Sequence, residues 1–173
     1  KLQSFIFMPV FGLNNGMVPI ISYNYGAARL DRVRQTFRLT AAVATVIMVI
    51  GCAAFNLIPG LLLGFFSPSE EMLAIGTVAL RVTSYAFLLA GFDIIAGSVC
   101  QAIGNPLHTL IVSVCRQLLA LLPVAWLLAR TGILDLVWLC YPISEVVSLI
   151  LSILFLRRTM RDAEEKIGTP GNG

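Results

Sequence analysis

Five long apolar stretches divide the sequence and form its strongest pattern. Each exceeds about 20 residues, the length that lets an α-helix cross a hydrocarbon core of about 30 Å. The stretches are too long for barrel strands, and unpaired backbone is too costly in lipid for open β-structure. The pattern therefore predicts an all-α, polytopic transmembrane bundle of about five spans. The expected spans cover residues 2–23, 39–66, 72–103, 107–129 and 133–156, and a charged tail follows at 157–173.

Composition supports the membrane assignment. Apolar residues make up 58% of the 173 residues and charged residues only 12%, whereas about 25% of a soluble domain is charged. This excess of apolar material excludes a soluble enzyme and a disordered chain. The sequence also lacks the zinc-protease and serine-hydrolase motifs. We therefore expect no enzyme and no cofactor, with membrane lipid as a partner and, at a net charge of +3, no nucleic acid.

Basic residues are distributed unevenly around the predicted spans. Eight lie in the loop 23–38 and the tail 157–173, against two in the segments on the other side. Because cytoplasmic segments carry an excess of lysine and arginine, this asymmetry predicts a multi-pass protein of the cell membrane with a cytoplasmic C-terminus. Within the loop, Leu30, Val33 and Phe37 recur at helical spacing between arginines. That pattern predicts a short amphipathic helix on the membrane surface, either an orientation anchor or a regulated lipid-binding element.

A layer of polar side chains is expected near the middle of the membrane. At a rise of about 1.5 Å per residue, Asp93 and Asn15 lie roughly 16 Å from the cytoplasmic ends of their spans, Arg116 roughly 14 Å and Glu145 roughly 18 Å. Asn14 adjoins Asn15. The centre of a core of about 30 Å lies near the same depth. Because buried ionisable groups are costly, this coincidence indicates a functional site.

The charges in this layer allow several assignments. One acid can neutralise Arg116, which leaves the other to bind a proton or a metal cation. We expect Asp93 to be the cation-coupling residue, and a metal ligand if the ion is sodium. Arg116 and Glu145 are either its electrostatic neighbours or a buried ion pair that fixes helix register. Asn14 and Asn15 can bind a cation through their carbonyl oxygens or form hydrogen bonds between helices.

Four prolines lie near this layer: Pro9, Pro19, Pro123 and Pro142. Each removes a backbone hydrogen bond, and interrupted helices are typical of transporter binding sites. We therefore expect broken helices around the polar residues.

Short motifs in the chain resemble the multidrug and toxic-compound extrusion (MATE) family. They are PIISYNYGA at 19–27 followed by RVR at 32–34, GNP at 104–106 followed by SxxRQ at 113–117, and PISE at 142–145. The resemblance implies helices eight to twelve of a twelve-helix transporter, in which two pseudo-symmetric lobes rock about a central cavity. It also implies export of lipophilic cationic drugs in exchange for Na⁺ or H⁺. Asp93 falls where such proteins often carry an acid that takes part in cation binding.

Two other functions compete with multidrug antiport. A lipid-linked oligosaccharide flippase of the same superfamily needs a basic cavity for pyrophosphate, whereas acids outnumber Arg116 at the midplane. A non-transporting scaffold subunit predicts that every midplane charge is paired and that no cavity exists. Since the chain does not open with Met and its first apolar stretch begins at once, we expect it to be one lobe of a longer polypeptide, whose remaining helices are its partners.

Overall fold

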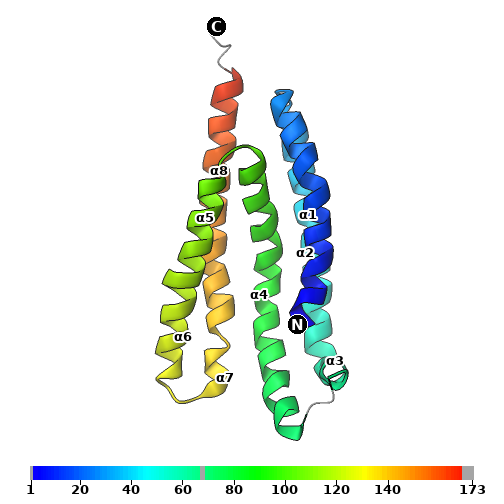
Figure 1. Ribbon diagram of the computed structural model, residues 1–173, viewed down its shortest axis with the longest axis vertical. Helices are drawn as coiled ribbons and strands as arrows, with labels where there is room; N and C mark the ends of the chain where they lie inside the picture. Colours follow the sequence, from blue (N-terminus) through cyan, green and yellow to red (C-terminus); the bar gives the residue numbers. More distant parts are fainter. Residues whose placement is uncertain (1, 67–68, 169–173) are drawn as a thin grey trace.

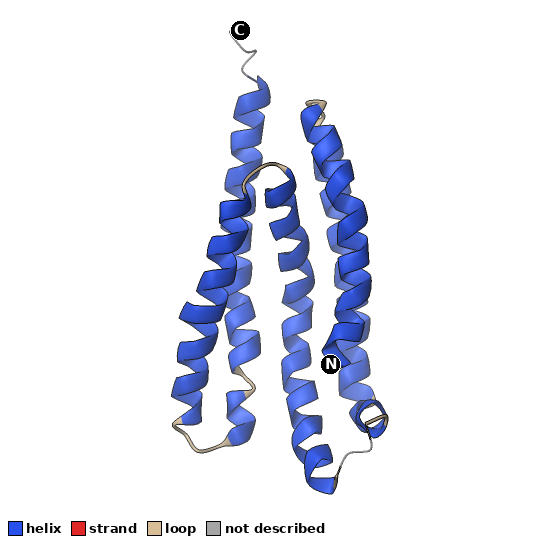
Figure 2. Cartoon of the chain, in the orientation of Figure 1, coloured by secondary structure: helices blue, strands red, loops and turns tan. Residues whose placement is uncertain are grey.

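The computed structural model describes residues 2–66 and 69–168, and within these ranges all regular structure is helical (Figures 1 and 2). The helices are α1 (Leu2–Gly26), α2 (Leu30–Leu57), α3 (Pro59–Gly64), α4 (Glu70–Ala102), α5 (Pro106–Val114), the π-helical η1 (Cys115–Leu121), α6 (Leu122–Ala129), α7 (Leu134–Val137) and α8 (Cys140–Gly168). Residue 1 of the predicted bundle and residues 169–173 of the predicted tail lie outside the described residues.

Five helical rods in the described part of the chain are long and apolar enough to cross a membrane. Three are α1, α2 and α4; the fourth joins α5, η1 and α6 (Pro106–Ala129), and the fifth covers Leu134–Ile167. The α1–α2 turn and the end of α8 lie at the same end of the molecule (Figure 1). The predicted all-α bundle with five spans is therefore confirmed.

The predicted surface helix around Leu30 does not exist as a separate element. Helix α2 begins at Leu30 and runs without a break to Leu57, because residues 30–50 contain neither glycine nor proline. Its apolar face also points inward: Val33 is fully buried, and Leu30 and Phe37 pack against the core. The amphipathic pattern therefore marks the first turns of a long helix that packs in the bundle.

One span boundary and one expected helix break also differ from the sequence prediction. The second expected span, 39–66, breaks at Ile58 because Pro59 starts the short helix α3. By contrast, α1 runs unbroken through Pro9 and Pro19, so the predicted interruption at these prolines is wrong. Each proline removes only one bond of the helical ladder, and the remaining bonds hold the rod together.

Helix α8 also continues beyond the expected end of its span at residue 156. It remains helical to Gly168, which includes much of the predicted tail. Arg161 and Glu165 form an ion pair one turn apart, with 3.8 Å between Nε and Oε1. Such pairs support an exposed helical turn. Pro142 is tolerated because it lies in the first turn of α8.

Helix α4 forms the centre of the bundle and packs against α1, α2, α5 and α8 (Figure 1). The aromatic rings of Phe55 and Phe7 both meet Phe87 edge to face, at centroid distances of 5.2 and 5.3 Å. The α2–α4 crossing is tight at Gly91, where an added Cβ would lie 2.8 Å from Met48 Cγ. Since lipid offers no hydrophobic force between helices, such close packing stabilises the bundle.

The turn between α4 and α5 positions the fourth rod against α4. Gly104 adopts a φ of +100°, a conformation that side chains with a Cβ rarely adopt. The reversed chain then packs α5 on α4, and the Thr109 hydroxyl donates a hydrogen bond to the Gly97 carbonyl at 2.9 Å. The fourth rod is thereby held beside the polar middle of α4.

Candidate functional site

A cavity of about 320 Å³ lies between α4, α8 and the fourth rod, with residues of α1 at its edge. The polar residues that line it come from helices far apart in the sequence. Those used below are Asn14, Asp93, His108, Thr109, Arg116, Ser148 and Ser152. The fold thus gathers several of the predicted midplane residues around one space.

Asp93 contributes a carboxylate to this cavity from the middle of α4. Its side chain is buried, with 8% of the residue exposed. Within the described ranges, neither carboxylate oxygen accepts a hydrogen bond. Ser148, Ser152 and Arg116 lie near enough to act on its charge. A carboxylate in this setting is either protonated or requires a cation.

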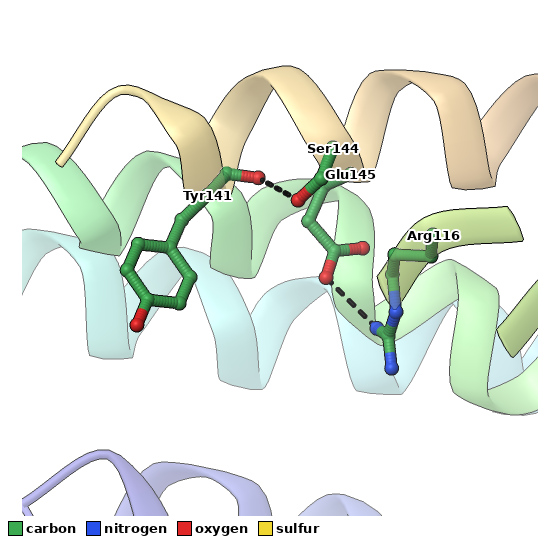
Figure 3. Close-up of polar contacts among 4 residues, drawn as sticks. All are labelled: Arg116, Tyr141, Ser144 and Glu145. Atoms are coloured by element: carbon green, nitrogen blue, oxygen red, sulfur yellow. Dashed lines mark hydrogen bonds and ion pairs between the residues drawn. The ribbon is translucent and has the colours of Figure 1, made fainter. Parts of the chain in front are cut away.

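Arg116 is held by a different acid. Its Nη1 donates to Glu145 Oε1 at 2.9 Å, joining the fourth rod to α8 (Figure 3). Arg116 lies in η1, where the Leu122 amide donates to the Gln117 carbonyl, five residues back. Pro123 follows directly, and π-helical turns of this kind are frequent at functional sites. The ion pair engages Arg116 with Glu145, whereas Asp93 forms no ion pair among the described residues.

Unpartnered oxygen atoms cluster beside Asp93. In the described part of the chain, the buried Asn14 Oδ1 and Ser148 Oγ have no hydrogen-bond partner, and both residues line the same cavity as Asp93. Buried polar atoms nearly always have a hydrogen-bond partner, so these oxygen atoms are available to accept a further contact. Carboxylate, amide and hydroxyl oxygens are the ligands that hard cations prefer.

Asn15 does not join this group. It is exposed on α1, because successive helical residues point about 100° apart and Asn14 already faces inward. The structure therefore brings together four of the five residues predicted for the polar layer: Asn14, Asp93, Arg116 and Glu145.

Two serines of α8 line the cavity but are not among the site residues predicted from the sequence. Ser148 and Ser152 follow Glu145 at three and seven residues, which places them on one helix face. That spacing could have assigned them to the site. His108 also lines the cavity: its Nδ1 lies 2.8 Å from Thr159 Oγ1, and its ring stacks on Phe155 at 4.6 Å.

The donor set limits which metals the site can hold. Across residues 2–66 and 69–168, no group of three or more histidine, cysteine or acidic residues could bind a metal ion. A site for zinc or another transition metal would require such nitrogen or sulfur ligands.

Comparison with known proteins identifies the family. A family model described as MatE matches residues 1–127. The chain belongs to the MatE family. The multidrug export protein MepA of Staphylococcus aureus (strain MSSA476) is 25% identical over 139 residues, which are 80% of this chain and 30% of the relative. The chain thus spans about a third of the length of the curated MATE relatives it matches.

Solved structures give the same result. The MATE multidrug transporter DinF-BH, solved in complex with a ligand, is 35% identical, with a TM-score of 0.82 over 91% of this chain and 35% of that one. Inward-facing and outward-facing MATE transporters of the MOP superfamily each match 95% of this chain with a TM-score of 0.87 at 20% identity, and the match covers 38% and 37% of those chains.

Membership in the family confirms two further expectations. The protein is a multi-pass transmembrane protein of the MATE type, as the relatives are. MATE proteins are transporters and not enzymes, so the expectation that this chain is no enzyme is confirmed.

Proposed function

We propose that the chain forms part of the C-terminal lobe, helices eight to twelve, of a cation-coupled multidrug antiporter. Na⁺ or H⁺ entering from outside binds at Asp93 and shifts the balance between outward-open and inward-open states. The shift releases a lipophilic cationic drug on the far side of the cell membrane. The uneven distribution of basic residues favours a cytoplasmic C-terminus for this arrangement.

One observation carries the proposal. Asp93 is a buried carboxylate without a hydrogen-bond partner among the described residues, and the nearby arginine is paired with Glu145 instead. The orphan oxygens of Asn14 and Ser148 lie on the same cavity. Binding a proton or a cation would relieve the cost of leaving these groups unpaired.

The alternating motion is supported by the fold comparison. The chain superposes with the same TM-score on an inward-facing and on an outward-facing MATE structure. This similarity to both states favours a lobe that moves as one body while its position relative to the other helices changes.

The two competing functions fit the site less well. A scaffold would leave no unpaired midplane acid and no cavity, whereas both are present here. A pyrophosphate-carrying lipid would need free positive charge, whereas Arg116, the basic residue that lines the cavity, is bound to Glu145. An uncompensated carboxylate favours cationic cargo.

The test uses the full-length transporter that contains this chain, reconstituted in lipid vesicles. Ethidium efflux is followed under an imposed Na⁺ gradient and, separately, an imposed H⁺ gradient. We expect one gradient to drive efflux and Asp93→Asn to reduce the rate to that measured without a gradient. The neutral amide keeps the shape of the side chain but cannot take up a proton or supply the negative charge that binds a cation.

The matched control is Asp135→Asn, which removes an exposed carboxylate in α7 that does not line the cavity. This variant should keep coupled efflux at the parent rate. Coupled efflux at the parent rate in Asp93→Asn would refute the role given to Asp93. Movement of lipid-linked sugar without ethidium efflux would favour the flippase instead.

A further inference from the structure

A basic pocket lies between α2 and α8, away from the Asp93 cavity and at the end of the molecule where α2 begins and α8 ends (Figure 1). Its volume is about 330 Å³. Four arginines line it, two from each helix: Arg34, Arg38, Arg157 and Arg161. Residues more than a hundred positions apart in the sequence thus contribute to one concentrated positive charge.

The pocket lies where the apolar part of each helix ends. Beyond Arg38, α2 carries no charged residue as far as Leu57, and between Glu145 and Arg157 α8 carries none either. Helix α2 has 28 residues, roughly 42 Å at about 1.5 Å per residue, which is longer than a hydrocarbon core of about 30 Å. The arginines therefore mark the boundary between hydrocarbon and the headgroup region.

The wall of the pocket is not uniformly polar. Phe37, Leu156 and Met160 line it together with the arginines. Phe37 is fixed by an edge-to-face contact with Phe92 of α4 at 5.8 Å, and Leu156 is buried. Charged and apolar surface in one pocket matches a ligand that has both a phosphate group and a hydrocarbon chain.

The charges of the pocket are only partly compensated. Arg34 forms an ion pair with Glu164, and Arg161 pairs with Glu165. In the described part of the chain, neither Arg38 nor Arg157 forms an ion pair with a carboxylate. The two helix ends, residues 29–38 and 157–166, carry eight basic and four acidic side chains. Free guanidinium groups at this point attract a phosphate, which arginine binds with two parallel hydrogen bonds.

We propose that this pocket binds the headgroup of an anionic phospholipid. The phosphate lies against Arg38 and Arg157, and the first carbons of an acyl chain lie against Met160 and Leu156. Basic pockets between transmembrane helices bind anionic lipid headgroups in this way. The pocket lies away from the cavity proposed for the coupling ion, so the proposal of lipid binding does not depend on the proposed antiport.

The experiment measures lipid retention by the purified full-length transporter, using native mass spectrometry in detergent. Phosphatidylglycerol and phosphatidylcholine with identical acyl chains are offered in turn. The unmodified protein should retain phosphatidylglycerol more strongly. A surface arginine contributes about fivefold to such binding, so Arg38→Gln with Arg157→Gln should weaken it about 30-fold.

The matched control removes the same charge at the same end of the molecule but outside the pocket. Arg29→Gln with Arg32→Gln serves, because Arg32 lines a different groove, between α1 and α2, and Arg29 precedes α2. This variant should retain phosphatidylglycerol nearly as well as the unmodified protein. Equal loss in both double variants would mean general charge attraction and would overturn the proposal.

A second variant tests the site in the opposite direction. Glu164→Gln removes the carboxylate that pairs with Arg34, so it should strengthen phosphatidylglycerol binding by about fivefold. It also keeps the test valid if the double arginine variant does not fold. Unchanged binding in Glu164→Gln and in the folded double arginine variant would refute the site. Displacement of the lipid by millimolar inorganic phosphate would show that the pocket takes a free anion instead.

Discussion

The middle of the bundle contains two carboxylates and one guanidinium group, which belong to Asp93, Glu145 and Arg116. In a low-dielectric environment, an acid that is paired with arginine is held in place, whereas an unpaired acid can bind a proton or a cation. The Arg116–Glu145 contact at 2.9 Å joins the fourth rod to α8, and Asp93 remains available. The site therefore combines one charge pair with one acid that forms no ion pair among the described residues.

A double-mutant cycle on Arg116 and Glu145 tests the pair. Arg116→Leu and Glu145→Leu each leave a charge without its partner, so each single change should lower the free energy of unfolding. The double variant should lose less than the sum of the two, with a coupling energy of about 0.5–3 kcal/mol. Thermal unfolding in detergent provides the measurement, and additive losses would contradict the pairing.

At the residue scale, depth counting was an effective predictor. It selected Asp93, Arg116 and Glu145, and Asn14 was added as the neighbour of Asn15. The structure places these four residues in and beside one cavity. It also selected Asn15, because depth along a helix carries no information about direction around the helix. The sequence offers the Arg116–Glu145 ion pair as one of two alternatives, because both acids lie at similar depth, and the structure shows that this pair forms.

The α2–α4 crossing shows how an element positions the site. Gly91 lets α2 approach α4 closely two residues before Asp93, with Met48 opposite. A side chain at position 91 must displace Met48 or separate the helices. The small residue thus determines how closely α2 approaches α4 beside Asp93.

Gly91→Leu tests the crossing. Overpacking at this contact should lower the free energy of unfolding by about 1–3 kcal/mol, measured as a lower melting temperature in detergent. Adding Met48→Ala makes room for the new side chain and should restore part of the loss. Gly60→Leu is the control, because an added Cβ there meets no atom within 4 Å. Failure of Met48→Ala to restore stability would argue against a tight crossing.

At the element scale, the number of membrane spans and their helical structure followed from the apolar stretches, while several helix boundaries did not. Arginines near Arg38 suggested a membrane boundary, which is a different property from a helix end, so α2 began earlier than predicted. Pro19 lies within an unbroken helix, whereas Pro123 follows a π-helical segment. Local sequence does not decide this difference, because neighbouring helices determine how each helix adapts.

At the scale of the whole molecule, the five rods form one packed unit around α4. The chain spans about a third of the length of its MATE relatives. In a membrane, an exposed apolar face can be covered by lipid or by another helix. No amino-acid pattern distinguishes these two kinds of face, because both require apolar side chains.

Motion as one body predicts constant distances inside the unit. Spin labels are placed at Leu57→Cys and Leu134→Cys, both exposed. The full-length transporter used has all its native cysteines replaced by alanine, including the four of this chain. The distance distribution measured by electron paramagnetic resonance should be the same with and without the driving ion gradient. A second pair, with one label in the other lobe, should change. A shift within the first pair would contradict rigid motion.

The helical end of α8 offers a practical advantage for imaging. From Arg157 to Gly168 the rod extends over roughly 17 Å beyond its uncharged segment 146–156, at about 1.5 Å per residue. A continuous helix can be spliced into the first helix of a soluble fusion partner without a flexible joint. The partner would then keep a fixed direction relative to the bundle and provide an alignment marker for electron cryomicroscopy.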